Sequence, residues 1–120
     1  LRAALAAAEA AWGEHTDIAD VRLARLNECT AGGDRGGWSD LVSRVITINS
    51  ACVWSKEFLR VVMAHEYGHM LAGSPAHSLD RHSVMFYRLA RGQRVKPADL
   101  AWARVKRERP TILMPNLMPQ

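Results

Sequence analysis

The sequence lacks a long hydrophobic run, and it contains few cysteines and few aromatic residues. Because it has no uninterrupted apolar window of about 18 residues, we expect no membrane span. Aromatic residues make up only 7% of the chain and form no ladder with basic residues, so a nucleic-acid partner is not favoured. The composition of 48% apolar and 23% charged residues is typical of a soluble globular protein.

The two cysteines, Cys29 and Cys52, lie at the ends of predicted strands. Their position predicts a disulfide and a secreted or extracellular protein; two buried free thiols and a cytoplasmic or virion-associated location are the alternatives. The net charge is +4, and its basic residues gather in the C-terminal third. We interpret this basic third as a solvated helix face, with an anionic partner such as nucleic acid or cell-envelope polymer as the alternative. The sequence indicates no oligomeric state.

Hydrophobic periodicity predicts an α+β fold in a single domain over residues 1–110, followed by an extended tail over 111–120. The absence of a Met at position 1 predicts a trimmed product that had a leader or first strand before Leu1. The expected helices cover residues 1 to about 13, 56–71 and 97–109, and the expected strands cover about 18–26 and 44–49. Ser55 suits the N-cap of the second helix, and Gly73 suits its C-terminal turn.

A pair of histidines on the second predicted helix carries the functional signal. His65 and His69 are four residues apart, so both imidazoles lie on one helix face and can bind a single ion. Glu66 lies beside them and can reach a water on that ion without being a ligand. This spacing predicts a catalytic metal site, preferably for Zn²⁺, with Glu66 as the general base.

A catalytic zinc site takes three protein ligands and keeps one position open, so a third ligand must come from beyond the helix. Three candidates follow the turn at Gly73: His77, Asp80 and His82. We favour His77, because a neutral imidazole suits zinc and the turn directs the chain back towards the helix.

The stretch from Val61 to Tyr87 resembles the metzincin clan of zinc peptidases, and most of all its matrixin branch. These proteins read His-Glu-x-x-His-x-x-Gly-x-x-His, followed by Ser and by a Ser-Val-Met turn, the Met-turn. The matching residues are His65, Glu66, Gly68, His69, His77, Ser78, Asp80, Ser83, Val84 and Met85. The flanks resemble the family at Ala11-Trp12, at Ile46–Asn49 as the edge strand, and at Pro97–Leu100.

The resemblance implies a zincin-like α+β fold with a small mixed sheet, an antiparallel edge strand, a long active-site helix, a Met-turn and a C-terminal helix. It also implies a zinc-dependent metalloprotease, a hydrolase with His65, His69 and His77 as metal ligands and Glu66 as catalytic base. Tyr87 follows the Met-turn as in astacin- and serralysin-like relatives, which implies a role at the oxyanion. A protein or peptide substrate is expected to bind extended along the edge strand at 45–49.

The sequence departs from the matrixin pattern at Ala72, where the family has glycine, and two extra residues precede His77. Two alternatives therefore stay open. One is a gluzincin-type peptidase with Glu108 as the third ligand. The other is a non-catalytic, zinc-stabilised binding module with a basic surface, in which Asp80 or His82 completes a closed metal shell.

Overall fold

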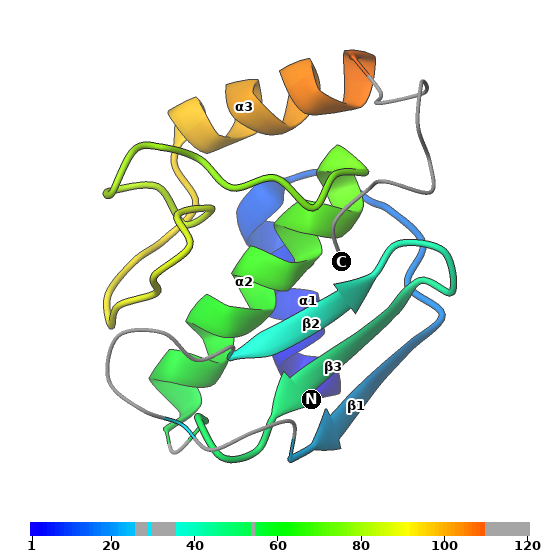
Figure 1. Cartoon of the computed structure of the whole chain (residues 1–120), viewed down its shortest axis with the longest axis vertical. Helices are drawn as coiled ribbons and strands as arrows, with labels where there is room; N and C mark the ends of the chain where they lie inside the picture. Colours follow the sequence, from blue (N-terminus) through cyan, green and yellow to red (C-terminus); the bar gives the residue numbers. More distant parts are fainter. Residues whose placement is uncertain (26–28, 30–35, 54, 110–120) are drawn as a thin grey trace.

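The computed structural model describes residues 1–25, 29, 36–53 and 55–109 (Figure 1). The predicted tail at 111–120, the end of the first predicted strand and most of the predicted loop at 30–37 lie outside the described residues. The described part is an α+β fold with elements in the order α1 (Arg2–Trp12), β1 (Asp20–Ala24), β2 (Gly37–Asp40), β3 (Val45–Asn49), α2 (Lys56–Ala72) and α3 (Pro97–Glu108).

The three described strands form a mixed sheet in the order β1-β3-β2. β1 pairs with β3 in parallel, and β2 pairs with β3 in antiparallel orientation. The expected antiparallel edge strand is therefore present, but its assignment to residues 45–49 was wrong. β3 is the central strand, which suits its fully buried Ile46 and Ile48, and β2 forms the edge.

β2 is the strand that the sequence did not reveal. Gly37 and Asp40 both disfavour strands, so only Trp38 in this four-residue segment favours one. The turn to β3 fixes it instead, because Asp40 Oδ1 accepts hydrogen bonds from the backbone N–H groups of Val42 at 3.0 Å and Ser43 at 3.1 Å. A local side-chain cap of this kind sets the hairpin without help from strand propensity.

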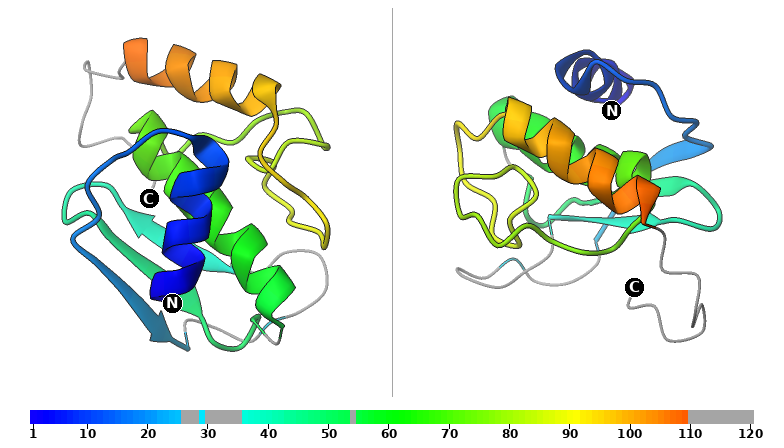
Figure 2. Two further views of the ribbon diagram at one scale, coloured as in Figure 1. Left: turned by 180° about the vertical axis from the view of Figure 1, so that it is seen from behind. Right: turned by 90° about the horizontal axis from the view of Figure 1, so that it is seen from above.

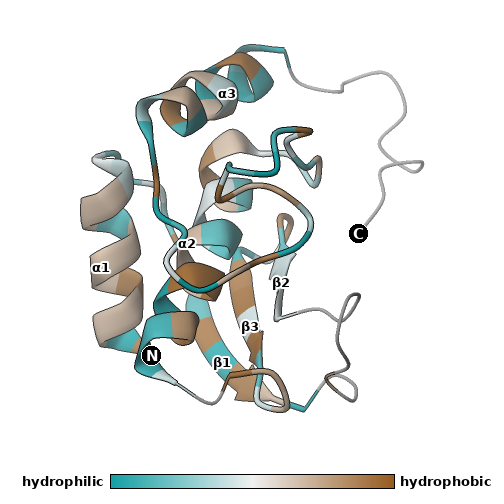
Figure 3. Ribbon diagram, turned by 90° about the vertical axis from the view of Figure 1, so that its left-hand side faces the viewer, coloured by the Kyte–Doolittle hydropathy of each residue, from teal (hydrophilic) through white to brown (hydrophobic). Residues whose placement is uncertain are grey.

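The core lies between the sheet, α2 and α1. α2 packs against β2 and β3 on one side and against α1 on another, and the left view of Figure 2 shows α1 in front of α2. Every α2 residue from 61 to 72 is buried. In Figure 3, hydrophobic and hydrophilic colours alternate along β1, and β3 is mainly hydrophobic. Val21, Ile46 and Ile48 supply the sheet side of the core. A helix buried on nearly all sides is a rigid support for a functional site.

Both predicted ends of α2 are confirmed. The Ser55 hydroxyl accepts a hydrogen bond from the Phe58 N–H at 3.1 Å, which satisfies one of the free donors of the first turn. Gly73 ends the helix in the left-handed conformation, with φ of 62°, and its N–H bonds back to the last turn. The chain therefore reverses directly after the two histidines.

The predicted disulfide is present and joins Cys29 to Cys52. It links the segment after β1 to the segment between β3 and α2. Within the described ranges, no helix combines the length and the apolar character that crossing a membrane requires.

Candidate metal centre

α2 presents His65 and His69 from its buried face. The two side chains are four residues apart, and their Nε2 atoms are 3.1 Å from each other. His65 is 4% exposed and His69 is 6% exposed, so protein atoms hold both rings in place.

Backbone carbonyls fix the tautomer of each ring. His65 Nδ1 lies 2.7 Å from the carbonyl oxygen of Val84, and His69 Nδ1 lies 2.9 Å from that of Ser74. A carbonyl only accepts hydrogen bonds, so both protons reside on Nδ1 and both Nε2 lone pairs point at one another. Two facing lone pairs repel unless a cation lies between them, which is the arrangement of a metal site with an outer shell of carbonyls.

A proton is a poor candidate for that cation at neutral pH. Burial lowers the pKa of His65 to about 4, against the raising effect of its hydrogen bond to Val84. Burial also lowers the pKa of His69 to about 4. Both imidazoles are thus neutral at pH 7, which is the form that binds metal ions.

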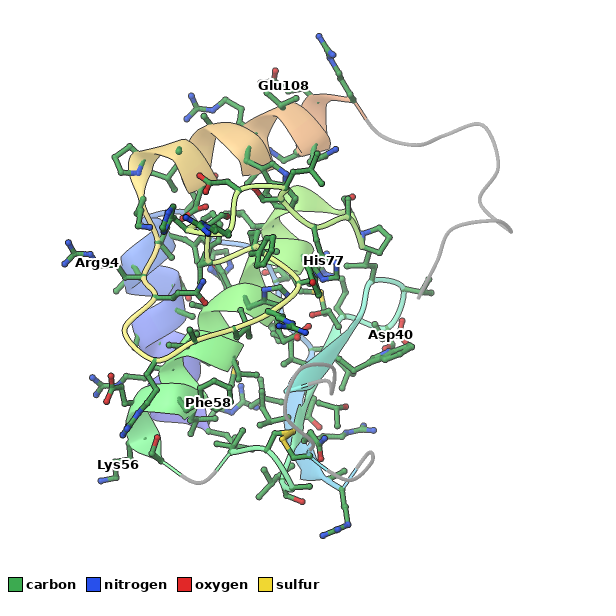
Figure 4. All side chains as sticks on the ribbon, turned by 60° about the vertical axis from the view of Figure 1, so that its left-hand side comes forward. Asp40, Lys56, Phe58, His77, Arg94 and Glu108 are labelled. Atoms are coloured by element: carbon green, nitrogen blue, oxygen red, sulfur yellow. A yellow bond between two sulfur atoms is a disulfide. The ribbon has the colours of Figure 1, made fainter. Side chains whose placement is uncertain are left out.

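His77 joins this pair from the irregular segment after α2. The three histidines each offer a ligand atom, and these atoms all lie within 4.8 Å of one another. The His77 ring centroid is 5.2 Å from that of His65 and 5.0 Å from that of His69. Unlike the helical pair, His77 is exposed. Figure 4 shows it on the same side of α2 as Asp40, the last residue of β2.

A short backbone bridge holds the segment that carries His77. The N–H of Ser78, the next residue, donates to the Met85 carbonyl at 2.9 Å, and Ser78 pairs with Phe86 in parallel. The Met-turn therefore holds the segment with the third histidine and, through the Val84 carbonyl, also orients His65.

The other proposed ligands have different positions. The carboxylate of Asp80 accepts the N–H of His82 at 2.9 Å, so it closes a local turn. Glu108 is exposed at the end of α3. Within the described part of the chain, His65, His69 and His77 form the one group of three or more such side chains close enough to share an ion. A donor set of three imidazoles suits a transition-metal ion and leaves further coordination positions free.

Glu66 is held beside the histidines by the edge strand. Ser39 Oγ, on β2, lies 2.6 Å from Glu66 Oε1 and 2.9 Å from the Glu66 carbonyl oxygen, and its hydroxyl donates to them. Gly37 leaves room for the carboxylate, since a Cβ there would lie 3.0 Å from Glu66 Cγ and 3.1 Å from Oε2. Neither Ser39 nor Gly37 can be identified from the sequence, because nothing in the sequence pairs β2 with α2.

The floor of the site is apolar and tightly packed. Met85 is fully buried, and Gly68 lets it approach α2, because a Cβ on Gly68 would lie 2.4 Å from Met85 Sδ and 2.6 Å from Trp12 Cζ2. Trp12 in turn donates its ring N–H to the Ala64 carbonyl at 2.9 Å. The matched residues Gly68 and Met85 thus act as a packing pair beneath the histidines.

A buried carboxylate connects the Met-turn to α3. Asp99, 2% exposed, accepts hydrogen bonds from the Ser83 hydroxyl and, at 2.9 Å, from the Lys96 N–H. The Ser83 hydroxyl also accepts the Met85 N–H at 2.9 Å. Through its bond from Ser83, Asp99 therefore fixes the turn below the three histidines.

Tyr87, the predicted oxyanion donor, is 61% exposed. Its ring centroid lies 4.7 Å from that of Phe86, and the Arg88 guanidinium lies over the ring at 5.8 Å. Tyr87 therefore lies at the surface, although it is only two residues beyond the buried Met85.

No family model, curated protein or solved structure compared with the chain matches it.

Proposed function

We propose that the protein is a zinc-dependent endopeptidase of the metzincin type. The observation that carries the proposal is the convergence of three imidazoles beside a buried, oriented carboxylate on the same helix. A structural metal site would normally have a fourth protein ligand and no need for a positioned base.

His65, His69 and His77 would hold the ion. When bound, zinc supplies Lewis acidity, which lowers the pKa of water and polarises a peptide carbonyl. The fixed Nδ1 hydrogen bonds of His65 and His69 support this role, since they direct Nε2 inward without rearrangement.

Glu66 would take a proton from the attacking water and pass it to the leaving amine. The hydrogen bond from Ser39 supports this assignment, because it holds the carboxylate in one orientation before substrate binds. Tyr87 stays our predicted donor to the developing oxyanion, and Tyr87→Phe should lower kcat/KM by about tenfold or more if its hydroxyl reaches that oxygen.

The peptide substrate would bind extended along β2. This strand is the antiparallel edge of the described sheet, and one of its residues contacts the proposed base. An edge strand offers unpaired backbone groups that can align a peptide by strand addition. The substrate-binding strand is thus moved from residues 45–49, as first expected, to Gly37–Asp40.

Replacement of the base tests the proposal. In the zinc-loaded protein, Glu66→Gln should retain zinc affinity and lower kcat/KM on a peptide library by about 10²- to 10⁴-fold, because only the proton acceptor is lost. Zinc content is measured by competition with a chromogenic chelator, and cleavage is followed by mass spectrometry.

Glu108→Gln provides the matched control, because it makes the same change on an exposed residue of α3. It should leave both zinc affinity and cleavage unchanged. Loss of zinc binding in this variant would favour the gluzincin-type arrangement. Cleavage that survives intact in Glu66→Gln, or a zinc-loaded parent that cleaves no peptide, would refute the proposed peptidase mechanism.

A further inference from the structure

A pocket lies between α1, α2 and the segment at 92–95, with a volume of about 470 Å³. This volume is in the range of about 300–1,000 Å³ that holds small organic ligands in proteins. The pocket is lined by Ala7, Ala8, Ala11, Lys56, Glu57, Arg60, Val61, Ala64, Gly92, Gln93, Arg94 and Val95. None of the residues assigned to the metal centre is among them.

Of the α2 residues that line the pocket, Val61 lies on the same face as His65, and the others project away from it. At about 100° per residue, Ala64 and Arg60 project about 100° and 140° round the helix from His65. Figure 4 shows the same separation, with Lys56 and Arg94 on one side of the molecule and His77 on the other. An occupant of this pocket would therefore not compete with a metal ion.

The walls of the pocket are aliphatic. α1 contributes alanines, α2 contributes Val61 and Ala64, and the segment after the Met-turn contributes Val95. Val61 and Ala64 are buried beneath the pocket surface. Walls of this kind, with no aromatic ring among the lining residues, suit a flexible hydrocarbon chain better than a planar ring.

The rim of the pocket carries uncompensated positive charge. Lys56, Arg60 and Arg94 line it and are exposed, and across the described residues none of the three has an acidic partner. The single acidic lining residue, Glu57, has a carboxylate oxygen 3.7 Å from Arg91 Nη2, so its charge is already paired.

Two arginines on α3 differ from the basic residues of the rim because they form ion pairs. Arg104 and Arg107 on α3 both contact Glu14, at 3.7 Å and 3.0 Å. Glu14 partly neutralises the positive charge on α3, whereas the rim of the pocket keeps its positive charge. Such a charge attracts an anion.

We propose that this pocket binds a small anionic amphiphile, an aliphatic carboxylate whose chain lies against the alanine and valine walls and whose head group meets Arg60 and Arg94. Each part of the ligand then matches one part of the site: hydrocarbon against aliphatic side chains, and carboxylate against guanidinium groups that can form paired hydrogen bonds. The proposal does not depend on peptidase activity.

Decanoate, titrated below its aggregation concentration into the full chain with EDTA present, tests the proposal by calorimetry. The chain should bind one equivalent, and affinity should rise about threefold to fourfold for each methylene between hexanoate and decanoate. Arg60→Gln combined with Arg94→Gln should weaken binding by about tenfold or more, because both charge-assisted contacts are lost. His77→Ala should bind decanoate as the parent does.

Two control variants separate the pocket from general electrostatics. Arg81→Gln combined with Arg109→Gln removes the same charge from exposed sites outside the pocket and should change affinity by less than about twofold. Ala11→Leu narrows the hydrocarbon half of the pocket without a change in charge, and it should weaken decanoate more than hexanoate. Circular dichroism verifies that each variant is folded.

The inference is overturned if the parent chain fails to bind decanoate, if both double variants weaken binding equally, or if decyltrimethylammonium binds as well as decanoate. Tighter binding of a glutamate-rich peptide than of decanoate would assign the pocket to a peptide and would equally overturn it.

Discussion

Two parts of the candidate metal centre are built in opposite ways. His65 and His69 come from a buried helix, and carbonyls on neighbouring segments orient each ring. His77 comes from an irregular, exposed segment that one backbone bridge connects to the Met-turn. The helical half is therefore preset by the core, whereas the third position depends on a few local contacts.

This difference indicates that His65 and His69 fix the coordination geometry, whereas the position of His77 can vary. A ring that is buried and hydrogen-bonded keeps its place without a metal ion, so it costs little ordering entropy when the ion binds. An exposed ring on a loop has to be ordered at that moment.

The largest expected effect comes from removing a ligand from each half. His69→Ala and His77→Ala should both weaken zinc binding by more than about a hundredfold, since loss of an outer partner alone costs about 10- to 100-fold. Free imidazole should restore zinc binding in His77→Ala, where the vacated position is open to solvent. It should fail in His69→Ala, whose side chain is only 6% exposed.

Zinc titration with and without imidazole measures this contrast, and Glu108→Gln serves again as the unaffected reference. Rescue of both variants to the same extent would remove the proposed difference between the two halves.

A smaller effect should follow from a larger side chain at Gly68, beneath His65 and His69. Gly68→Ala introduces a methyl group that would lie 2.4 Å from Met85 Sδ, so either the Met-turn or Trp12 must move. We expect a loss of about 1–3 kcal/mol in the free energy of unfolding, measured by urea denaturation, together with weaker zinc binding.

Met85→Ala in the same chain provides the control, because it makes room for the new methyl group. The two changes should be less than additive. Full additivity would show that Gly68 and Met85 are not in the contact described.

Removing the hydroxyl that orients Glu66 should have a more modest effect. Ser39→Ala should lower kcat by about tenfold with little change in KM or zinc affinity, because a hydrogen bond to a charged group contributes about 1.5–3 kcal/mol and water replaces part of it. Ser39→Thr keeps the hydroxyl and should recover most of the rate. An equal loss in both variants would assign Ser39 to packing of β2 instead.

The smallest effect concerns an exposed histidine, the counterpart of the buried pair. His15 Nδ1 and Nε2 lie 3.0 Å from Glu9 and Asp17 carboxylate oxygens, and these hydrogen bonds raise its pKa above 6.5. The protonated form is thus favoured on folding, so its slight stabilisation is fully present below pH 6.5 and is lost as the pH rises through the folded pKa. A His15 titration by NMR with a midpoint at or below 6.5 would contradict this assignment.

The sequence predicted the elements that local rules determine. Ser55 and Gly73 mark the ends of α2 because capping depends only on neighbouring residues. The closeness of His65 and His69 was predicted for the same reason, since helical spacing alone brings them together. The grouping of His77 with them matches the candidate favoured from the turn that follows the helix.

The features that the sequence did not reveal depend on contacts between distant segments. β2 has little strand propensity and exists through its pairing with β3, so the edge strand was assigned to the wrong residues. Ser39 reaches Glu66 across 27 positions, and Ser83 reaches Asp99 across 16. No local sequence pattern encodes contacts between residues so far apart, so a single sequence does not predict them.

The Cys29–Cys52 bond has a consequence for a protein proposed to cut peptide bonds. Both β2 and β3 lie inside the covalent ring that it closes. One accidental cleavage of the backbone within that ring would leave a nicked but still covalently joined chain, whose two pieces separate only after reduction. The strand nearest to Glu66 is thereby retained even when it has been severed from its neighbour in sequence.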